Sequence, residues 1–142
     1  MRVRRAKGRV VRLGNLERSI MEALWARPEG VFAQELADSL PSRPAATTVL
    51  TVLVRLSNKG LVSRERRGRA HLYKATAGKD AFVAETMRAA LDEAGDLSAA
   101  VNRFVGSVSP EVAAALREAL DDRGEALEGR GEVLEGRGEA KP

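Results

Sequence analysis

The sequence predicts a mainly helical fold with one small β-hairpin, in which a compact N-terminal domain precedes a separate helical region. Three observations support this prediction. Apolar residues recur at helical spacing in several segments. One arginine-rich segment alternates about a central Gly68, as the two strands of a hairpin do. Finally, residues 1–79 hold 17 Lys and Arg against 6 Asp and Glu, whereas residues 80–142 hold 7 against 14.

The composition excludes several classes of protein. The 142 residues include no cysteine, which excludes disulfides, zinc fingers and thiolate metal sites. No apolar run approaches the roughly 18 residues of a membrane span, and no signal-peptide pattern is present, so we expect a protein of the bacterial cytoplasm. The carboxylates form no nucleophile–base arrangement and no glycine-rich phosphate loop occurs. We therefore predict neither enzymatic activity nor a cofactor.

The first elements form the predicted core. Residues 1–12 carry six cations and suggest a flexible arm, either a solvated tail or a segment that contacts DNA. A first helix spans Leu13–Trp25, with Asn15 as its expected N-cap. Val31–Phe32 could add a brief strand to the hairpin sheet. A second helix spans Ala33–Leu40, and two prolines close it before a tight turn.

The third helix is the most informative element of the chain. Its apolar side comprises Val49, Val52, Leu53 and Leu56. Its opposite side carries Thr47, Thr51, Val54 and Asn58, flanked by Thr48 and Arg55. These short side chains leave the helix narrow enough for a DNA major groove about 12 Å wide. Gly60 ends the helix with a left-handed residue.

A cationic hairpin follows directly, and the order of elements predicts a winged helix-turn-helix domain that binds double-stranded DNA. We predict base contacts from Thr47, Thr48 and Thr51, whereas Arg55, the fourth DNA-binding residue of this helix, could reach guanine or, more commonly, a phosphate. The phosphate contacts of the wing and its flanks are assigned to Arg43, Arg64, Arg66, Arg67 and Arg69. His71, the only histidine, is expected to be structural, because the sequence gathers no partners for a metal ion.

Residues 79–121 form three predicted amphipathic helices that are too small to fold alone, so we expect them to hold a homodimer together. The predicted interface comprises Val83, Met87, Leu91, Leu97, Val101, Phe104, Val105, Val112, Leu116 and Leu120. The domains are thus a basic arm (1–12), a winged-helix domain (13–78), a dimerisation region (79–121) and a tail (122–142). The tail repeats every seven residues, but two glycines per repeat favour disorder over a coiled coil.

Three segments together resemble the penicillinase repressors, the BlaI/MecI/CopY family of bacterial regulators. The first is Leu13-Gly14-Asn15-Leu16-Glu17 with the apolar pairs Ile20-Met21 and Leu24-Trp25. The second is Thr47–Leu53 with Arg55-Leu56 and Lys59-Gly60-Leu61-Val62, and the third is the wing with Arg64, Arg66, Gly68-Arg69 and Leu72-Tyr73. The resemblance covers roughly residues 13–120. Ala46 departs from it, because the family often has tyrosine or proline there.

The resemblance implies a homodimeric repressor on an inverted-repeat operator with TACA/TGTA half-sites, often controlling β-lactam resistance or copper handling. It maps the groove-facing positions onto Thr47, Thr48, Thr51 and Arg55. Release by copper requires a C-terminal cysteine cluster, which is absent. Release by a sensor-protease pathway would cut between Arg103 and Phe104, where the family has asparagine before the phenylalanine. Two alternatives to a repressor are a protein-interaction module and a non-specific architectural DNA-binding protein.

Overall fold

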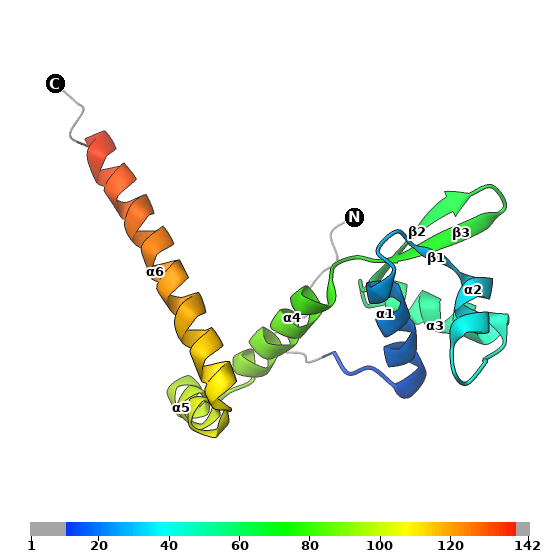
Figure 1. Cartoon of the computed structure of the whole chain (residues 1–142), viewed down its shortest axis with the longest axis horizontal. Coiled ribbons are helices and arrows are strands. Elements are labelled where there is room, and N and C mark those ends of the chain that lie inside the picture. The colour runs from blue at the N-terminus through cyan, green and yellow to red at the C-terminus, as the bar shows by residue number, and fades with distance from the viewer. Residues whose placement is uncertain (1–10, 139–142) are drawn as a thin grey trace. The chain divides into compact units, whose positions relative to one another are not determined.

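The computed structural model describes residues 11–138, and side chains as far as residue 128. Two compact units divide between Ala94 and Gly95. The elements, shown in Figure 1, are α1 Asn15–Ala26, β1 Val31–Phe32, α2 Ala33–Ser39, α3 Ala46–Asn58, β2 Val62–Arg67, β3 Ala70–Ala75 and α4 Lys79–Asp92 in the first unit, and α5 Leu97–Ser107 and α6 Pro110–Gly138 in the second. Within the described residues, none of these helices is long and apolar enough to span a bilayer. The predicted basic arm lies outside the described residues, except for its last two positions.

A three-stranded antiparallel sheet closes one side of the first unit. Its strand order is β1-β3-β2, so the short strand β1 pairs with the hairpin, as the sequence suggested. Strands β2 and β3 are joined by Gly68 and Arg69 alone, because Arg67 pairs directly with Ala70. Gly68 adopts φ +62°, a left-handed conformation that glycine adopts at little cost in a tight turn.

The core of the first unit forms where α1, α2 and α3 meet the sheet. Its buried apolar residues are Ile20, Met21, Leu24, Val31, Leu36, Ala37, Leu40, Val49, Val52, Leu53, Leu56, Val62 and Tyr73. The apolar positions predicted from helical spacing in α3 are therefore confirmed. Each fully buried leucine stabilises the fold by about 1.5–3 kcal/mol relative to an exposed one. The core is thus sufficient to fix the orientation of α3.

Helix α1 begins at Asn15, so its N-cap lies one residue before the expected cap. Gly14, not Asn15, is the N-cap residue, and its extended backbone leaves an N–H free at the helix start. The Glu17 carboxylate accepts a hydrogen bond from this N–H at 3.2 Å. The prediction of an asparagine cap was wrong because Glu17 reaches back to the backbone itself.

Helix α4 belongs to the first unit, whereas the sequence predicted a domain boundary before it. The rings of Trp25 and Phe82 lie 5.3 Å apart between centroids, and Lys79 Nζ lies 2.8 Å from Glu22 Oε1. Both contacts attach the start of α4 to α1. Because each joins residues more than fifty positions apart, no local pattern could predict them.

Helix α6 continues to Gly138, whereas the sequence predicted disorder from residue 122. The last four residues lie outside the described part of the chain. Between its glycines the repeat consists mainly of Glu, Arg, Ala and Leu, which are good helix formers. The helix is already nucleated at Pro110, so extending it costs less than starting a new one.

Candidate nucleic-acid interface

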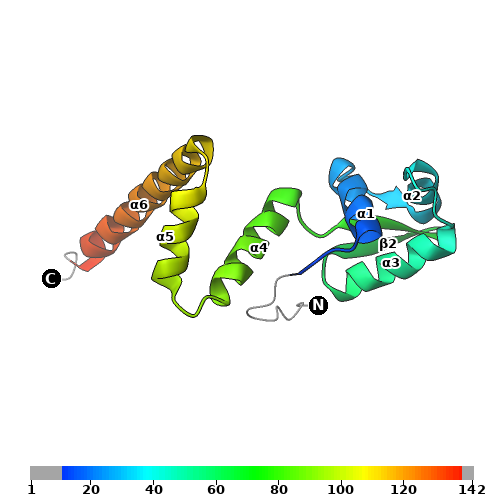
Figure 2. The ribbon, with the colours of Figure 1, turned by 90° about the horizontal axis from the view of Figure 1, so that it is seen from below.

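Helix α3 presents one face to the core and the other to solvent. Its predicted inner residues are buried. Its outer face comprises Thr47, Leu50, Thr51, Val54 and Asn58, all of which are exposed. Figure 2 shows α3 at the surface of the first unit, and no element of that unit covers it. The predicted groove-facing positions Thr48 and Arg55 are exposed as well, at the edge of this face.

The outer face of α3 is less polar than its threonines suggest. Leu50 is 40 % exposed and Val54 is 55 % exposed. The Thr51 hydroxyl donates to the Thr47 carbonyl oxygen at 3.0 Å, so its proton is bound within the helix. Methyl groups therefore dominate this surface. Leu50 was missed by the sequence prediction, although it lies on the Thr47 side of the helix by its three-residue spacing.

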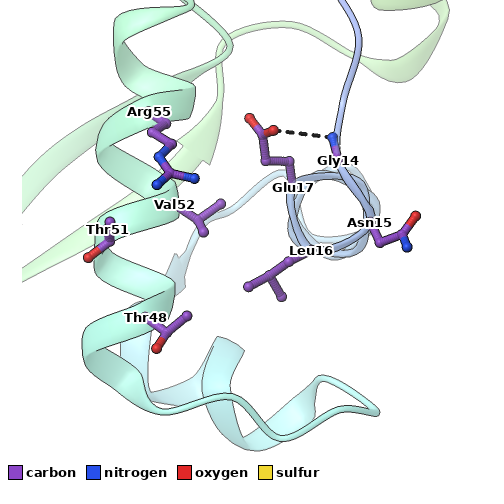
Figure 3. Close-up of a pocket in the computed structure, with 8 residues that line it drawn as sticks. All are labelled: Gly14, Asn15, Leu16, Glu17, Thr48, Thr51, Val52 and Arg55. Atoms are coloured by element: carbon purple, nitrogen blue, oxygen red, sulfur yellow. Dashed lines mark hydrogen bonds between the residues drawn. The ribbon is translucent and has the colours of Figure 1, made fainter.

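An open groove of about 440 Å³ lies between the start of α1 and the side of α3. Its lining residues are Gly14, Asn15, Leu16, Glu17, Thr48, Thr51, Val52 and Arg55. Figure 3 shows the Arg55 side chain extending from α3 into the space on the side where Glu17 lies. The groove therefore adjoins the outer face of α3 and adds residues from α1 to it. The sequence prediction treated Glu17 only as a residue of the helix start.

Glu17 is held by several positive groups. Lys59 Nζ lies 2.7 Å from the carboxylate and lowers the pKa of Glu17 through this hydrogen bond. The Gly14 N–H and the positive charges of Lys59 and Arg55 lower it further, while burial acts in the opposite direction. Glu17 thus stays ionised and is neutralised mainly by Lys59. Among the described residues, none accepts a hydrogen bond from Arg55, whose guanidinium is exposed.

The arginines of the wing fall into two groups. Arg67 pairs with Glu65 at 3.2 Å, and Lys74 contacts the same carboxylate at 3.5 Å. Arg66 donates through Nε to the Gly68 carbonyl oxygen at 3.2 Å. These two arginines are partly engaged within the hairpin. The sequence prediction had treated all wing arginines as equivalent.

Arg64 and Arg69 differ, because neither side chain is hydrogen-bonded or ion-paired within the described residues. Arg64 lies opposite Tyr73 in the sheet register, and Arg69 occupies the turn. Both are exposed. Unengaged guanidinium groups are well suited to bind phosphate, because they lose no internal partner on doing so.

Arg43 projects from the turn between α2 and α3. It is exposed and adopts φ +43°, a left-handed conformation that is unfavourable for any residue with a side chain. Its N–H donates to the Leu40 carbonyl oxygen at 2.9 Å, which closes the turn. The turn thus holds a cation just before α3.

His71 lies in strand β3 of the wing, and no metal ligands gather around it among the described side chains. It pairs with Arg66 in the register of the sheet, and its ring lies 6.4 Å from that of Tyr73. Its Nδ1 atom is buried without a hydrogen-bond partner among the described groups. Across residues 11–128, whose side chains the structure describes, no three His, Cys, Asp or Glu side chains gather as metal ligands would.

The residues predicted to dimerise form exposed apolar stripes in both units. In α4, Val83, Met87 and Leu91 are 40–45 % exposed. In α5 and α6 the corresponding residues, 39–67 % exposed, are Leu97, Val101, Phe104, Val105, Val112 and Leu120. Leu116 is half-buried. Apolar side chains gathered on helices in this way are typical of surfaces covered by a partner.

Comparison with known proteins identifies the family. A family model described as the penicillinase repressor matches residues 13–122. The transcriptional regulator BlaI of two strains of Mycobacterium tuberculosis is 42 % identical over 117 residues, which cover 79 % of this chain and 85 % of the relative.

Solved structures add two similar chains. One is the DNA-binding domain of the repressor BlaI, with 22 % identity and a TM-score of 0.44 over 52 % of this chain and 90 % of that one. The other is MepR, a transcription regulator of a Staphylococcus aureus multidrug efflux pump, with 17 % identity and a TM-score of 0.43 over 81 % and 80 %. The family model and the sequence relatives decide the assignment: this chain belongs to the penicillinase repressor family.

Proposed function

We propose that this chain is a DNA-binding transcriptional repressor that acts as a homodimer on an inverted-repeat operator. The observation that carries the proposal is the solvent-facing side of α3, which stands beside an arginine-bearing wing and an exposed turn arginine. Membership of the penicillinase repressor family supports it, as does 42 % identity to a protein named a transcriptional regulator.

The dimensions of α3 suit the major groove. Thr47, Thr51 and Val54 are short enough to approach base edges, and their methyl groups can contact the C5-methyl of thymine. Arg55, at the edge of the α1–α3 groove, would bind guanine or a backbone phosphate. Repression follows from occupancy, because a protein seated on the promoter blocks access of the polymerase.

The wing and turn supply the phosphate contacts. We expect Arg43, Arg64 and Arg69 to contribute most, since each is exposed and unpaired to any side chain among the described residues. Arg66 and Arg67 contribute less, because binding DNA must first release their internal partners. These contacts carry little sequence information and set the salt dependence of binding.

Two copies are needed to match an inverted repeat. The exposed stripes of α4, α5 and α6 supply the apolar surface for pairing, and the acidic half of the chain is kept away from phosphate by its charge. The two α3 helices should then lie roughly 34 Å apart, one turn of DNA.

Release of the repressor by proteolysis is part of this proposal. The Arg103–Phe104 bond lies within α5, which is capped by the Asp96 carboxylate on the Ala99 N–H. A protease requires an extended substrate, so cleavage would need local unfolding of α5. Removing this cap with Asp96→Ala should accelerate cleavage by the cognate protease without changing the scissile residues.

Substitution of Thr51 by glutamate tests the proposed DNA contact. The carboxylate would face phosphate and base edges, so affinity for a dyad-containing fragment of the gene's own promoter should fall by at least about 100-fold. Ala81→Glu is the matched control, because it introduces the same charge at an exposed site in the first turn of α4. Binding is measured by fluorescence anisotropy at near-physiological salt, with thermal unfolding as a check on folding.

Three outcomes are informative. Loss of binding by Thr51→Glu with normal binding by Ala81→Glu supports the proposal. Equal binding of the wild-type chain to the promoter fragment and to random DNA would instead indicate an architectural DNA-binding protein. No binding to either would favour a protein-interaction module.

A further inference from the structure

The C-terminal part of α6 lies beyond the residues matched to the family, which end at residue 122. This segment is helical to Gly138. Figures 1 and 2 show it continuing past α5 as a straight helix with no other element of its unit alongside. The family assignment therefore gives no role for it, and within its own unit no other described element lies beside it.

Leucine recurs every seven residues along this helix. Leu120 is 67 % exposed and Leu127 is 54 % exposed, and the sequence places Leu134 seven residues further on. Seven residues are close to two helical turns, so the three positions follow one side of α6. These three leucines form a leucine seam, and its described members, Leu120 and Leu127, are exposed.

In each repeat a glycine follows the leucine by four residues. Gly124 lies four residues after Leu120, and the sequence repeats the spacing at Gly131 and Gly138. A methyl group added at Gly124 would meet nothing within 4 Å, so nothing described in this chain requires glycine there. Glycines weaken a helix, by about 1 kcal/mol each, and a second helix packed closely against them would offset that cost.

The charges beside the seam determine its orientation. With leucine at position d of the heptad, Arg123 falls at position g and Glu128 at position e. In a parallel pair, g of one helix faces the e position five residues further on in its partner, so Arg123 meets Glu128. In an antiparallel pair, arginine would face arginine and glutamate would face glutamate. The sequence repeats this pattern with Arg130 and Glu135.

We propose that residues 120–138 of α6 form a parallel two-stranded coiled coil with the same segment of a second copy of this chain. Leucine fills the d positions, glycine allows close approach at a, and arginine–glutamate pairs flank the seam. This pairing does not depend on DNA binding. It extends beyond the apolar stripes of the family-matched region and would lock two copies in register.

Disulfide trapping tests this pairing directly, because the natural chain has no cysteine. In a parallel pair each Gly124 lies opposite its own copy, within reach of the roughly 4.4–6.8 Å that a disulfide spans between Cα atoms. Gly124→Cys should therefore form a covalent dimer under mild oxidation. Asp122→Cys lies on the outer side of the same helix, where pairing does not bring the two thiols together. It should therefore form the disulfide at least about tenfold more slowly.

Charge reversal tests the orientation. In the Gly124→Cys chain, Arg123→Glu should slow the trapping by about tenfold, and adding Glu128→Arg should restore it, since the pair is re-formed with opposite signs. Leu127→Glu in the same chain should abolish rapid trapping, whereas Ala126→Glu should not. Equal rates at residues 122 and 124, or no rescue by the reversed pair, would overturn the proposal. Promoter binding by a chain that ends at Asp122, measured in parallel, reports separately on the proposed repressor function.

Discussion

The two units of this chain bury their apolar side chains very differently. Among the described residues, every buried apolar side chain lies before Gly95. In the second unit Leu97, Phe104 and Leu120 are 41–67 % exposed. Both units contain apolar residues at helical spacing, but only the first has a sheet and several helices that converge on one core. Helical spacing alone therefore does not give a self-sufficient domain, and the exposed apolar surface of the second unit is the surface that the proposed homodimer would cover.

The largest expected effect is the loss of a core leucine in the first unit. Leu53 is fully buried, so Leu53→Ala should lower the free energy of unfolding by about 2–5 kcal/mol, through lost burial and a cavity. Urea denaturation measures this change. Leu120→Ala makes the same chemical change at an exposed site and should alter the unfolding of the monomer by less than about 0.5 kcal/mol. Equal costs for the two variants would contradict the difference between the units.

Phe104 tests whether a partner covers the second unit. Phe104→Glu places a charge on the exposed stripe of α5 and should weaken self-association by about 10- to 100-fold. Sedimentation equilibrium over a range of concentrations measures the dimer constant. Ser98→Glu is the control, because an acid in the first turn of α5 is favourable there and adds the same charge. A dimer constant unaffected by Phe104→Glu would show that this stripe is not the interface.

Phe82 tests where the boundary between the units lies. Removing its ring with Phe82→Ala eliminates the contact with Trp25 and should destabilise the first unit by about 1–2 kcal/mol. Because Trp25 is the only tryptophan, its fluorescence should change in the folded state of this variant. Val83→Ala, at the exposed neighbouring position, should leave the fluorescence unchanged. If Phe82→Ala behaves like Val83→Ala, α4 does not pack on α1.

The smallest effect concerns the ion pair beside the α1–α3 groove. The pKa of Glu17 is lowered in the folded state, chiefly by its hydrogen bond to Lys59. This carboxylate therefore stabilises the fold above the pKa of an unfolded glutamate, about 4.3, and the stabilisation is lost as the pH falls through the lower folded value. Glu17→Gln should cost less than about 1 kcal/mol at neutral pH, since the pair is partly exposed.

Thermal unfolding as a function of pH checks this prediction. The difference between wild type and Glu17→Gln should shrink in acid, because both side chains are then uncharged. Glu29→Gln, at an exposed position, should show no such difference at any pH. A gap that stays constant or widens in acid would mean that Glu17 acts through packing rather than charge.

Local sequence patterns predicted much of the first unit. The buried side of helix α3, its end before Gly60 and the hairpin turn at Gly68 were predicted correctly, because each depends on neighbouring residues alone. The same holds for the exposure of Thr47 and Thr51.

Contacts between distant residues could not be predicted in this way. The Trp25–Phe82 contact joins α4 to α1 within the first unit. The Glu17–Lys59 pair joins α1 to the end of α3, beside the candidate interface. The extension of α6 was missed for a different reason. The two glycines of each repeat disfavour a helix locally, but a helix already nucleated at Pro110 can extend through them at lower cost than a new helix would need.

The hydrogen bond between the Thr51 hydroxyl and the Thr47 carbonyl has a consequence for how bases would be distinguished. With its proton retained inside the helix, Thr51 presents a methyl group to a ligand, beside the exposed side chains of Leu50 and Val54. A duplex in which uracil replaces thymine keeps its base pairing and its phosphates but loses the matching hydrophobic contact. Such a duplex should therefore bind more weakly, whereas a surface that relied on hydroxyl donors would not distinguish the two.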